Sequence, residues 1–312
     1  MRVVILGAGG CFGQNLAMYL APRHALLGIG RSYVKSAPYS LGFDWAYFAF
    51  HLIEHFEVAW SQIEDFKPDA IVNFAAQAGL VPQSWQYPRE FYETNLLLPV
   101  EIAKRLPKDC RFVQIGSSEV YGSTNYAASE TAPLKPSSPY AVSKGAADDH
   151  LLTLHDERIT IVRPSNCYCP GQALYRLIPR AVLAGLTGKK ITLQGNPQKS
   201  YMHADDLSRA IEMLLEAGLP GVFNVGADYP SHIKEIVALV AQELGIPLAE
   251  MVEFAPGRQH EDDCFWIDSS KMKARGWKPE ISMRAGIRTM IEWGRKYQKE
   301  LGEMDVDYRF RP

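Results

Sequence analysis

A tyrosine and a lysine stand four residues apart near the middle of the chain, in the sequence Tyr140-Ala-Val-Ser-Lys144. On a helix, this spacing places the phenol and the ammonium on one face. A free phenol has a pKa of about 10 and is a poor base at neutral pH, but a neighbouring cation favours the phenolate and lowers that pKa. The pair therefore predicts a centre for removing a proton from a hydroxyl group.

Two further residues that can donate or accept protons, Ser117 and Glu119, follow the predicted strand 111–115. Ligands bind beyond the carboxyl ends of parallel strands, so the loop that contains them is expected to face the site. Ser117 is expected to hydrogen-bond the substrate oxygen that Tyr140 deprotonates. Glu119 is a second proton acceptor, with an exposed loop acid as the alternative.

Three glycines at intervals of three residues, Gly7, Gly10 and Gly13, follow a predicted strand and begin a predicted helix. In that context the first glycine allows a tight turn, the next lets backbone N–H groups approach a pyrophosphate, and the third allows close helix packing. The loop therefore predicts a dinucleotide site, with a simple strand-to-helix turn as the alternative. Its spacing differs from that of the common dehydrogenase loop.

The second predicted strand, 25–29, is followed by Gly30-Arg31-Ser32, where an NAD enzyme would carry an acidic residue for the ribose. A guanidinium and a hydroxyl suit a 2′-phosphate, which favours NADP over NAD. Stacking of Arg31 on adenine is the alternative. An aromatic segment, 43–60, comes next, and within it Asp44 is the candidate for contact with the adenine amine.

Short apolar runs alternate with helical patterns in the first half of the chain, which is typical of a doubly wound parallel sheet with helices on both faces. We therefore predict an α/β, Rossmann-like fold with a smaller C-terminal α/β substrate lobe. The Rossmann domain is expected to span residues 1–165 and to include about 195–228, and the lobe to comprise 166–194 and 229–312. Strands are predicted at 2–6, 25–29, 70–74, 111–115, 160–163, 190–193 and 222–225, and helices at 13–20, 91–105 with an interruption near Pro99, 140–154, 178–186, 205–216, 232–244 and 282–301.

Composition and charge exclude several classes of protein. The 312 residues include 33 Lys and Arg against 35 Asp and Glu, for a net charge of −2, and 47% are hydrophobic. This is the balance of a globular protein without the basic surface that nucleic acid or an anionic membrane would need. No apolar run is long enough to span a membrane and none precedes Gly7 as a secretory signal would, so we expect a cytoplasmic protein. The five cysteines are odd in number and scattered, as expected for free thiols in a reducing compartment.

The segment His51-Leu52-Ile53-Glu54-His55 matches, letter for letter, a zinc-protease pattern in which two histidines share one face of a helix. It lies among aromatic residues in the first half of a predicted dinucleotide-binding fold, where a zinc ion would have no reaction to take part in. No metal is therefore expected.

Taken in order, these motifs resemble the extended short-chain dehydrogenases/reductases, and within them the NAD-dependent epimerase/dehydratase family, which acts on nucleotide sugars. The resemblance covers nearly the whole chain. It rests on the glycine loop 7–13, Asn73-Phe74-Ala75-Ala76, Ser117-Ser118-Glu119-Val120-Tyr121-Gly122, Tyr140 with Lys144, Arg163-Pro164-Ser165-Asn166, 200–206, 268–271 and Gly276-Trp277-Lys278-Pro279.

The resemblance implies a catalytic triad of Ser117, Tyr140 and Lys144, and a reaction that begins with oxidation of a sugar at C4 by NAD or NADP. In sugar-nucleotide 4,6-dehydratases, a glutamate two positions after the serine or threonine removes the C5 proton, and Glu119 occupies that position. A ketone at C4 acidifies the C5 proton, so a nearby carboxylate can take it. The favoured function is therefore 4,6-dehydration of a nucleoside diphosphate sugar to a 4-keto-6-deoxy sugar.

Other reactions of the family stay open. They are epimerisation, net oxidation or reduction at C4, and decarboxylation of the UDP-glucuronate type, whose enzymes also carry Ser-Glu in this loop. A cofactor-binding regulator without turnover is a remote alternative. Ser118 stands where the dTDP-glucose dehydratases carry aspartate, so the chain is more similar to the GDP-mannose 4,6-dehydratase type. Relatives commonly dimerise through two helices, which implies a homodimer formed by 88–105 and 140–154.

The resemblance also implies two sets of ligand contacts, with two departures from the family's pattern. Cys169 stands where the family has glycine, and Lys199 stands where it has an arginine, whose bidentate clamp on a phosphate lysine cannot make. Dinucleotide contacts are expected from Gly7, Gly10, Cys11, Phe12, Gly13, Arg31, Ser32, Asp44, Phe74, Ala75, Ala76, Asn95, Tyr140, Lys144 and Pro164. Substrate contacts are expected from Gln77, Ser118, Asn166, Lys199 and Arg258.

Overall fold

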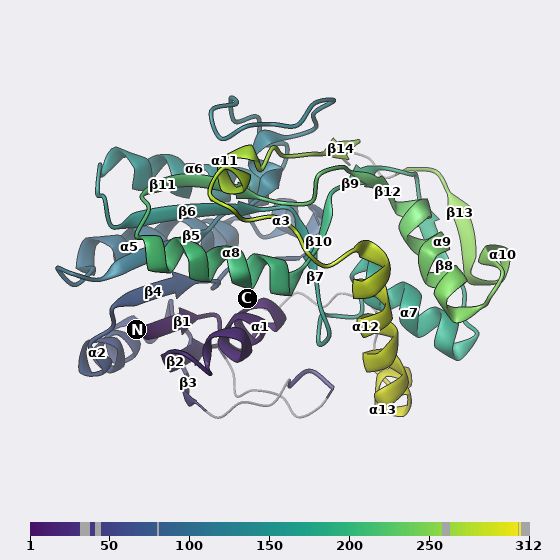
Figure 1. The fold of residues 1–312 in the computed structure, drawn as a ribbon, viewed down its shortest axis with the longest axis horizontal. Coiled ribbons are helices and arrows are strands. Elements are labelled where there is room, and N and C mark those ends of the chain that lie inside the picture. The colour runs from purple at the N-terminus through teal and green to yellow at the C-terminus, as the bar shows by residue number, and fades with distance from the viewer. Residues whose placement is uncertain (32–37, 41–44, 80, 258–262, 305, 307–312) are drawn as a thin grey trace.

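Seven parallel strands form one sheet, in the order β11-β6-β5-β4-β1-β2-β3 (Figure 1). The computed structural model describes residues 1–31, 38–40, 45–79, 81–257, 263–304 and 306. The strand order reverses between β1 and β4, as in a doubly wound sheet, so the predicted Rossmann-like α/β class is confirmed. The strands are β1 (Arg2–Leu6), β2 (Ala25–Gly30), β3 (Ala46–Ala49), β4 (Ala70–Asn73), β5 (Arg111–Ile115), β6 (Ile159–Pro164) and β11 (Gly221–Val225).

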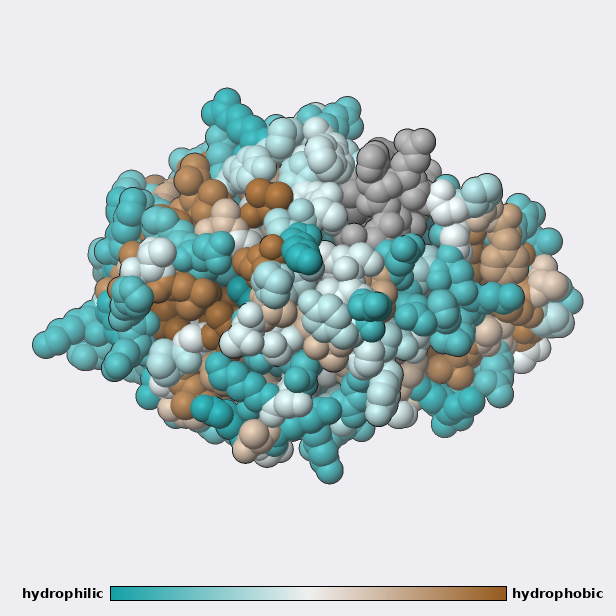
Figure 2. All heavy atoms as spheres, turned by 90° about the horizontal axis from the view of Figure 1, so that it is seen from above, coloured by the Kyte–Doolittle hydropathy of each residue, from teal (hydrophilic) through white to brown (hydrophobic). Residues whose placement is uncertain are grey.

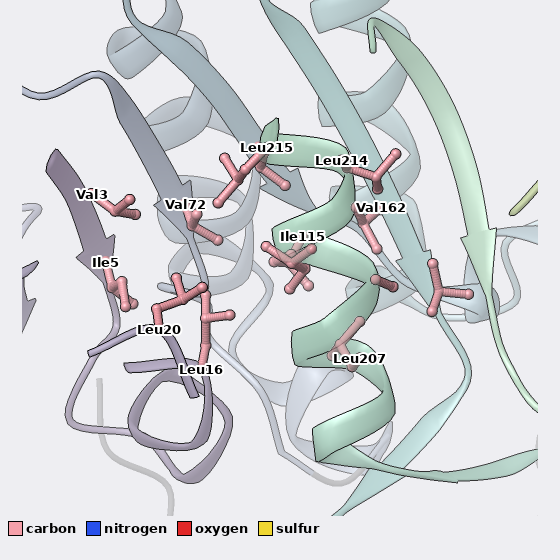
Figure 3. Close-up of a cluster of buried hydrophobic side chains, with 14 of the residues drawn as sticks. Val3, Ile5, Leu16, Leu20, Val72, Ile115, Val162, Leu207, Leu214 and Leu215 are labelled. Carbon is pink, nitrogen blue, oxygen red and sulfur yellow. The ribbon is translucent and has the colours of Figure 1, made fainter. Parts of the chain in front are cut away.

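Alternate residues of β1 enter opposite cores, which explains why this central strand is apolar after Arg2. Val3 and Ile5 pack with α1 and α8 on one face of the sheet, as Figure 3 shows beside Leu16. Val4 and Leu6 pack with α2 and α5 on the other face. The helices that cover the sheet are α1 (Cys11–Leu20), α2 (Phe56–Phe66), α5 (Leu98–Arg105), α6 (Pro139–Thr153) and α8 (Ala204–Ala217).

A second core lies to the right of the sheet in Figure 1 and forms the smaller α/β lobe. Its centre is the packing of α7, α9 and α12 around buried side chains such as Val182, Val240 and Ile287. The parallel pair of β8 and β13 closes this core on one side. The elements are α7 (Leu177–Thr187), β8 (Ile191–Gln194), α9 (Ile233–Leu244), α10 (Leu248–Met251), β13 (Val252–Ala255), α12 (Met283–Lys296) and α13 (Gln298–Gly302).

Short elements join the sheet to this lobe. β10 pairs with β7 in parallel, so the chain that leaves β6 lies beside the chain that enters α8. A second small sheet combines β9 with β12 and β14. The bounds are β7 (Asn166–Tyr168), β9 (Gln198–Lys199), β10 (Tyr201–His203), β12 (Ser231–His232), β14 (Cys264–Phe265) and α11 (Ser270–Lys273).

The structure contains several elements that the sequence pattern did not predict. The aromatic segment contains the edge strand β3 and the helix α2, which the sequence pattern did not predict. His51 and His55 lie in the turn between these two elements, so they do not share a helix face as the zinc-protease pattern requires.

The predicted interruption of the helix near Pro99 takes the form of a π-helical turn, η1 (Glu93–Leu97), between α4 (Pro88–Tyr92) and α5. Proline has no N–H, so it cannot donate the usual bond to the carbonyl four residues back. A short helix, α3 (Val81–Gln86), precedes these elements.

The face seen in Figure 2 is mostly hydrophilic, with apolar patches toward its left end, the side that carries the parallel sheet in Figure 1, and further apolar patches toward its right end. None of the helices in the described part of the chain combines the length and the apolar character that crossing a membrane would require.

Candidate active site

A cavity of about 390 Å³ opens beyond the carboxyl ends of β4, β5 and β6, and the elements of the smaller lobe close its other side. This is the position in which doubly wound sheets bind ligands. Predicted site residues that line the cavity are Phe12, Phe74, Ala76, Ser117, Ser118, Glu119, Tyr140, Lys144, Pro164, Asn166 and Lys199.

The start of α6 places Tyr140 against Ser117. Ser138 caps the helix, since its Oγ accepts a hydrogen bond from Ala141 N at 3.2 Å, and Pro139 occupies the first helical position. Tyr140 therefore sits in the first turn, and its side chain lines the cavity together with Ser117. Ser117 Oγ also accepts a bond from Glu119 N at 3.2 Å, which fixes the loop after β5.

The electrostatic environment of Tyr140 differs from the expectation. Burial raises the pKa of Tyr140 to about 12, and the Glu119 carboxylate adds to the rise. The Ser117 hydroxyl and the Arg176 guanidinium oppose the rise without reversing it. In the protein alone, therefore, the lowered phenol pKa predicted from the Tyr140–Lys144 spacing is not found, because loss of solvent outweighs the nearby donors and cations.

Lys144 is held beneath the cavity by the end of β5. Its Nζ donates to Ile115 O at 2.9 Å, and the side chain is only 3% exposed. Burial lowers the pKa of Lys144 to about 8, while the Asp148 carboxylate one turn further along α6 acts in the opposite direction. The ammonium thus carries a desolvation cost, because burial disfavours its charge.

A buried ionic network supports this end of α6. Asp148 Oδ2 accepts from Arg163 Nε at 2.7 Å, and Arg163 Nη1 donates to Tyr121 Oη at 2.8 Å. Tyr121 Oη in turn donates to Asn224 Oδ1 at 2.8 Å. The network ties α6 to β6, β11 and the 3₁₀ turn η2 (Ser118–Tyr121), so it holds Lys144 and the Ser117 loop in one rigid unit.

The glycine loop is shaped by close backbone contacts. Gly7 has φ of +77°, and a Cβ on it would lie 2.7 Å from Ala75 N. A Cβ on Gly13 would lie 2.8 Å from Ala8 Cα, so α1 packs directly on the loop. Helix α1 begins after Gly10 without a side-chain cap. An uncapped helix N-terminus beside a tight glycine turn suits an anion such as a diphosphate.

The predicted adenosine-side residues are only partly within the described chain. Gly30 ends β2 beside the glycine loop, since a Cβ on it would lie 3.1 Å from Gly9 N, and the exposed Arg31 follows it. Ser32 and Asp44 lie outside the described residues, as does the predicted substrate ligand Arg258.

Asn95, predicted to contact the dinucleotide, is completely buried. Its Oδ1 accepts from Gln77 N at 2.8 Å, and its Nδ2 donates to Gln77 O and to Ser143 Oγ, each at 3.0 Å. These bonds attach the loop after β4 to α6. The described contacts of Asn95 are therefore structural, and Gln77 is held through its backbone.

Sequence reasoning missed a group of side chains that approach the cavity from the smaller lobe. Arg176 precedes α7, and its guanidinium acts electrostatically on both Glu119 and Tyr140. No motif marks this position, because it reaches the site through the packing of α7 rather than through local sequence. The other members of the group are Gln172, Tyr175, Arg180, Thr192 and Gln194.

Comparison with known proteins agrees with this arrangement. Residues 3–226 match the model of the NAD dependent epimerase/dehydratase family. The chain is 28% identical over 276 residues to a dTDP-glucose 4,6-dehydratase of Xanthomonas campestris, a match that covers 79% of this chain and 78% of that protein. In Arabidopsis thaliana it is 28% identical over 240 residues to a trifunctional UDP-glucose 4,6-dehydratase/UDP-4-keto-6-deoxy-D-glucose 3,5-epimerase/UDP-4-keto-L-rhamnose-reductase, covering 72% of this chain. The match corresponds to 36% of the plant protein's length.

The fold is also similar to a solved structure, that of dTDP-glucose 4,6-dehydratase from Bacillus anthracis in complex with NAD. The TM-score is 0.83 with 27% sequence identity, over 96% of this chain and 98% of the other. The similarity therefore extends over the parallel sheet and the smaller lobe. The chain belongs to the NAD dependent epimerase/dehydratase family.

Proposed function

We propose that this protein catalyses the 4,6-dehydration of a nucleoside diphosphate hexose to a 4-keto-6-deoxy sugar. The observation that carries the proposal is the placement of Glu119 in the same cavity wall as Ser117 and Tyr140, close enough for its charge to act on the phenol. A phenol and a carboxylate side by side can each take a proton from adjacent positions of one sugar ring. Epimerisation at C4 needs only the first of these two transfers.

The glycine loop and its neighbours support binding of a nicotinamide dinucleotide. The uncapped start of α1 would receive the diphosphate, and the loop after β4 would lie along the cofactor. Tyr140 and Lys144 would contact the nicotinamide end from α6. When bound, this cofactor would supply hydride transfer, from C4 of the sugar and back to C6.

The remaining chemistry falls to residues of this chain. Tyr140 takes the proton of the C4 hydroxyl while Ser117 hydrogen-bonds that oxygen. This transfer requires the pKa of the Tyr140 phenol to fall below its raised value in the protein alone. Lys144 and Arg176 are the nearby cations that the chain supplies for this. Glu119 then takes the C5 proton, which the C4 ketone has acidified, and passes it to the C6 hydroxyl, which leaves as water. Once C6 has gained a hydride, C5 takes up a proton, which balances the one removed from the C4 hydroxyl and completes the 4-keto-6-deoxy sugar.

Exchange of Glu119 for glutamine tests this assignment. The Glu119→Gln variant should still produce reduced nicotinamide when mixed with substrate, seen by its absorbance, but should form no product lighter by one water molecule. Glu157→Gln, at an exposed position, is the matched control and should behave as wild type. A dehydrated product from Glu119→Gln would remove Glu119 from the proposed role.

For the cofactor, we propose that Arg31 binds the 2′-phosphate of NADP. Its position after β2, beside the glycine loop, supports this contact, and a guanidinium can bind a phosphate through two hydrogen bonds. Arg31→Asp should weaken NADP binding by at least about tenfold and leave NAD binding nearly unchanged in calorimetric titrations. Equal losses for both dinucleotides would mean that Arg31 stacks on adenine instead.

For the substrate, we propose that the smaller lobe, residues 166–194 and 229–312, forms a unit that binds the nucleotide-linked diphosphate against the Rossmann domain. The separate core of the lobe and the positions of Asn166 and Arg176 at the cavity support this division, with Lys199 at the cavity from the Rossmann side. Arg176→Ala and Lys199→Ala should each raise the dissociation constant for a nucleoside diphosphate. An unchanged constant in both variants would contradict the placement.

We further propose a homodimer formed by the helical segments 88–105 and 140–154. Apolar side chains stand exposed on both segments, with Leu97 58% and Leu152 41% exposed, and Val142 lies on the same helix as Leu152. An exposed apolar patch on neighbouring helices marks a surface that another protein chain can cover. Light scattering should give twice the chain mass for the wild type and a single chain mass for Leu97→Glu with Leu152→Glu. A monomeric wild type would contradict the proposal.

A further inference from the structure

Segment 38–40, which follows β2 in the chain, is hydrogen-bonded on two sides by residues that are distant in the sequence. On one side, Trp293 Nε1 donates to Pro38 O at 3.0 Å. On the other side, Gln14 Nε2 donates to Tyr39 O at 3.1 Å. Trp293 lies in α12 of the smaller lobe, and Gln14 lies in α1, which packs on the parallel sheet. The segment therefore bridges the two parts of the molecule, through side chains to which the proposed dehydration assigns no role.

The contact on the lobe side is buried. The Trp293 side chain is 6% exposed and belongs to the apolar core of the lobe, and Pro38 is also buried. An indole N–H that is removed from water needs an acceptor, and leaving it unpaired costs free energy. The bond to Pro38 O therefore favours the arrangement in which α12 and segment 38–40 are in contact.

Gln14 joins the same segment to the glycine loop. Its side chain is 2% exposed, and its Nε2 donates to Gly9 O at 3.1 Å as well as to Tyr39 O. A side-chain amide nitrogen carries two hydrogens, so both bonds can form at once. Any ligand that fixes the backbone of the glycine loop therefore also fixes one side of segment 38–40.

On the lobe side, the contacts of α12 continue to the candidate active site. A Cβ on Gly294, the neighbour of the tryptophan, would lie 2.8 Å from both Val182 Cγ1 and Leu186 Cδ1 of α7. Helix α12 therefore packs on α7 without room for a side chain between them. Arg176, at the N-terminal end of α7, lines the cavity. Because packed helices transmit small shifts, the position of α12 relative to the sheet decides where this wall of the cavity stands.

We propose that Trp293 is a positioning residue that couples dinucleotide binding to nucleotide-sugar binding. The proposal rests on the function proposed above, in which the dinucleotide occupies the glycine loop and the nucleotide-linked diphosphate lies at the lobe. A dinucleotide on the glycine loop would hold Gln14 and segment 38–40 in place. The Trp293 bond would then hold α12 in the arrangement that completes the substrate site. Because coupling between two sites is reciprocal, each ligand should raise the affinity for the other by the same factor.

Calorimetric titrations of the whole protein test this coupling without turnover. The probes dTDP, UDP and GDP are each titrated into protein alone and into protein saturated with the tighter-binding of NADP and NAD. The dinucleotide is then titrated with and without the nucleoside diphosphate that binds most tightly. For wild type, saturation with one ligand should lower the dissociation constant of the other by at least about fivefold, in both directions. Equal constants with and without the second ligand would overturn the proposal.

Two buried tryptophans provide matched variants for the same titrations. Trp293→Phe removes the indole N–H but keeps a ring in the core, so the coupling factor should fall to less than about twofold. Trp277→Phe is the control and should keep the wild-type factor, because Trp277 is also buried but its Nε1 donates to Asp206 O, at 3.0 Å. If Trp293→Phe does not fold, Gln14→Met removes the link from the glycine-loop side and should also abolish the coupling.

The outcomes for the coupling and for the proposed function can be told apart. Wild-type coupling in Trp293→Phe or in Gln14→Met, or loss of coupling in Trp277→Phe, would overturn the role of Trp293. Because the titrations require binding but no reaction, a protein that shows the coupling and releases no dehydrated product would refute only the proposed function.

Discussion

Replacing Lys144 by methionine separates the chemical role of this lysine from its cost to the fold. The fall of its pKa from 10.5 to about 8 means that burial disfavours the charged form by about 3 kcal/mol at pH 7. Methionine removes that penalty but leaves Ile115 O without its donor at 2.9 Å, which costs about 1–3 kcal/mol. The free energy of unfolding of Lys144→Met should therefore stay within about 2 kcal/mol of wild type, while turnover falls by at least about 10²-fold.

The pH dependence of stability makes this prediction sharper. Because the folded-state pKa of Lys144 lies below its unfolded value, the unfolded chain binds more protons between about pH 8 and 10.5. The lysine's penalty therefore disappears as the pH rises through that range. Relative to Lys144→Met, wild type should gain about 2 kcal/mol between pH 7 and about pH 9.5.

Urea unfolding of wild type and Lys144→Met at pH 7 and at about pH 9.5 measures this difference in the free energy of unfolding. Because the two proteins share all other titrating groups, the contributions of those groups cancel. Lys189→Met, at an exposed position, is the matched control and should show no such change. A gap between wild type and Lys144→Met that does not change with pH would refute a desolvated ammonium at this position. A loss of more than about 4 kcal/mol at pH 7 would show that the lysine stabilises the fold.

Three further predictions follow from the site and its support. Tyr140→Phe should lower turnover by at least about 10²-fold in a product assay and leave dinucleotide affinity nearly unchanged. Asp148→Asn leaves the buried Arg163 guanidinium without its 2.7 Å partner and should cost about 3–5 kcal/mol in urea unfolding, whereas Asp149→Asn, exposed on the same helix, should stay within about 0.5 kcal/mol of wild type. Gly13→Ala forces a methyl group against the loop backbone and should cost about 1–3 kcal/mol, together with a loss of dinucleotide binding in calorimetry.

Much of the fold could be predicted because its signals are local. The apolar run of β1, the glycines after it and the spacing of Tyr140 and Lys144 all lie within single elements. The edge strand β3 was missed because it is short and only half-buried, and α2 was missed although its apolar residues recur at helical spacing, at Phe56, Ala59, Trp60 and Ile63. Packing against β2 and the apolar core gives these residues their conformations.

The candidate site was less predictable where it depends on contacts between distant segments. Arg176 approaches Glu119 and Tyr140 only because α7 packs beside the sheet. The raised pKa of Tyr140 follows from burial, which a four-residue spacing does not reveal.

The central claim is that this cavity removes water from a nucleoside diphosphate hexose. Its most direct test is the mass of the product formed by the wild-type protein from dTDP-, UDP- and GDP-linked hexoses, each incubated with NAD and with NADP. A product lighter than its substrate by one water molecule is the predicted result. A product of unchanged mass and inverted configuration would contradict the account.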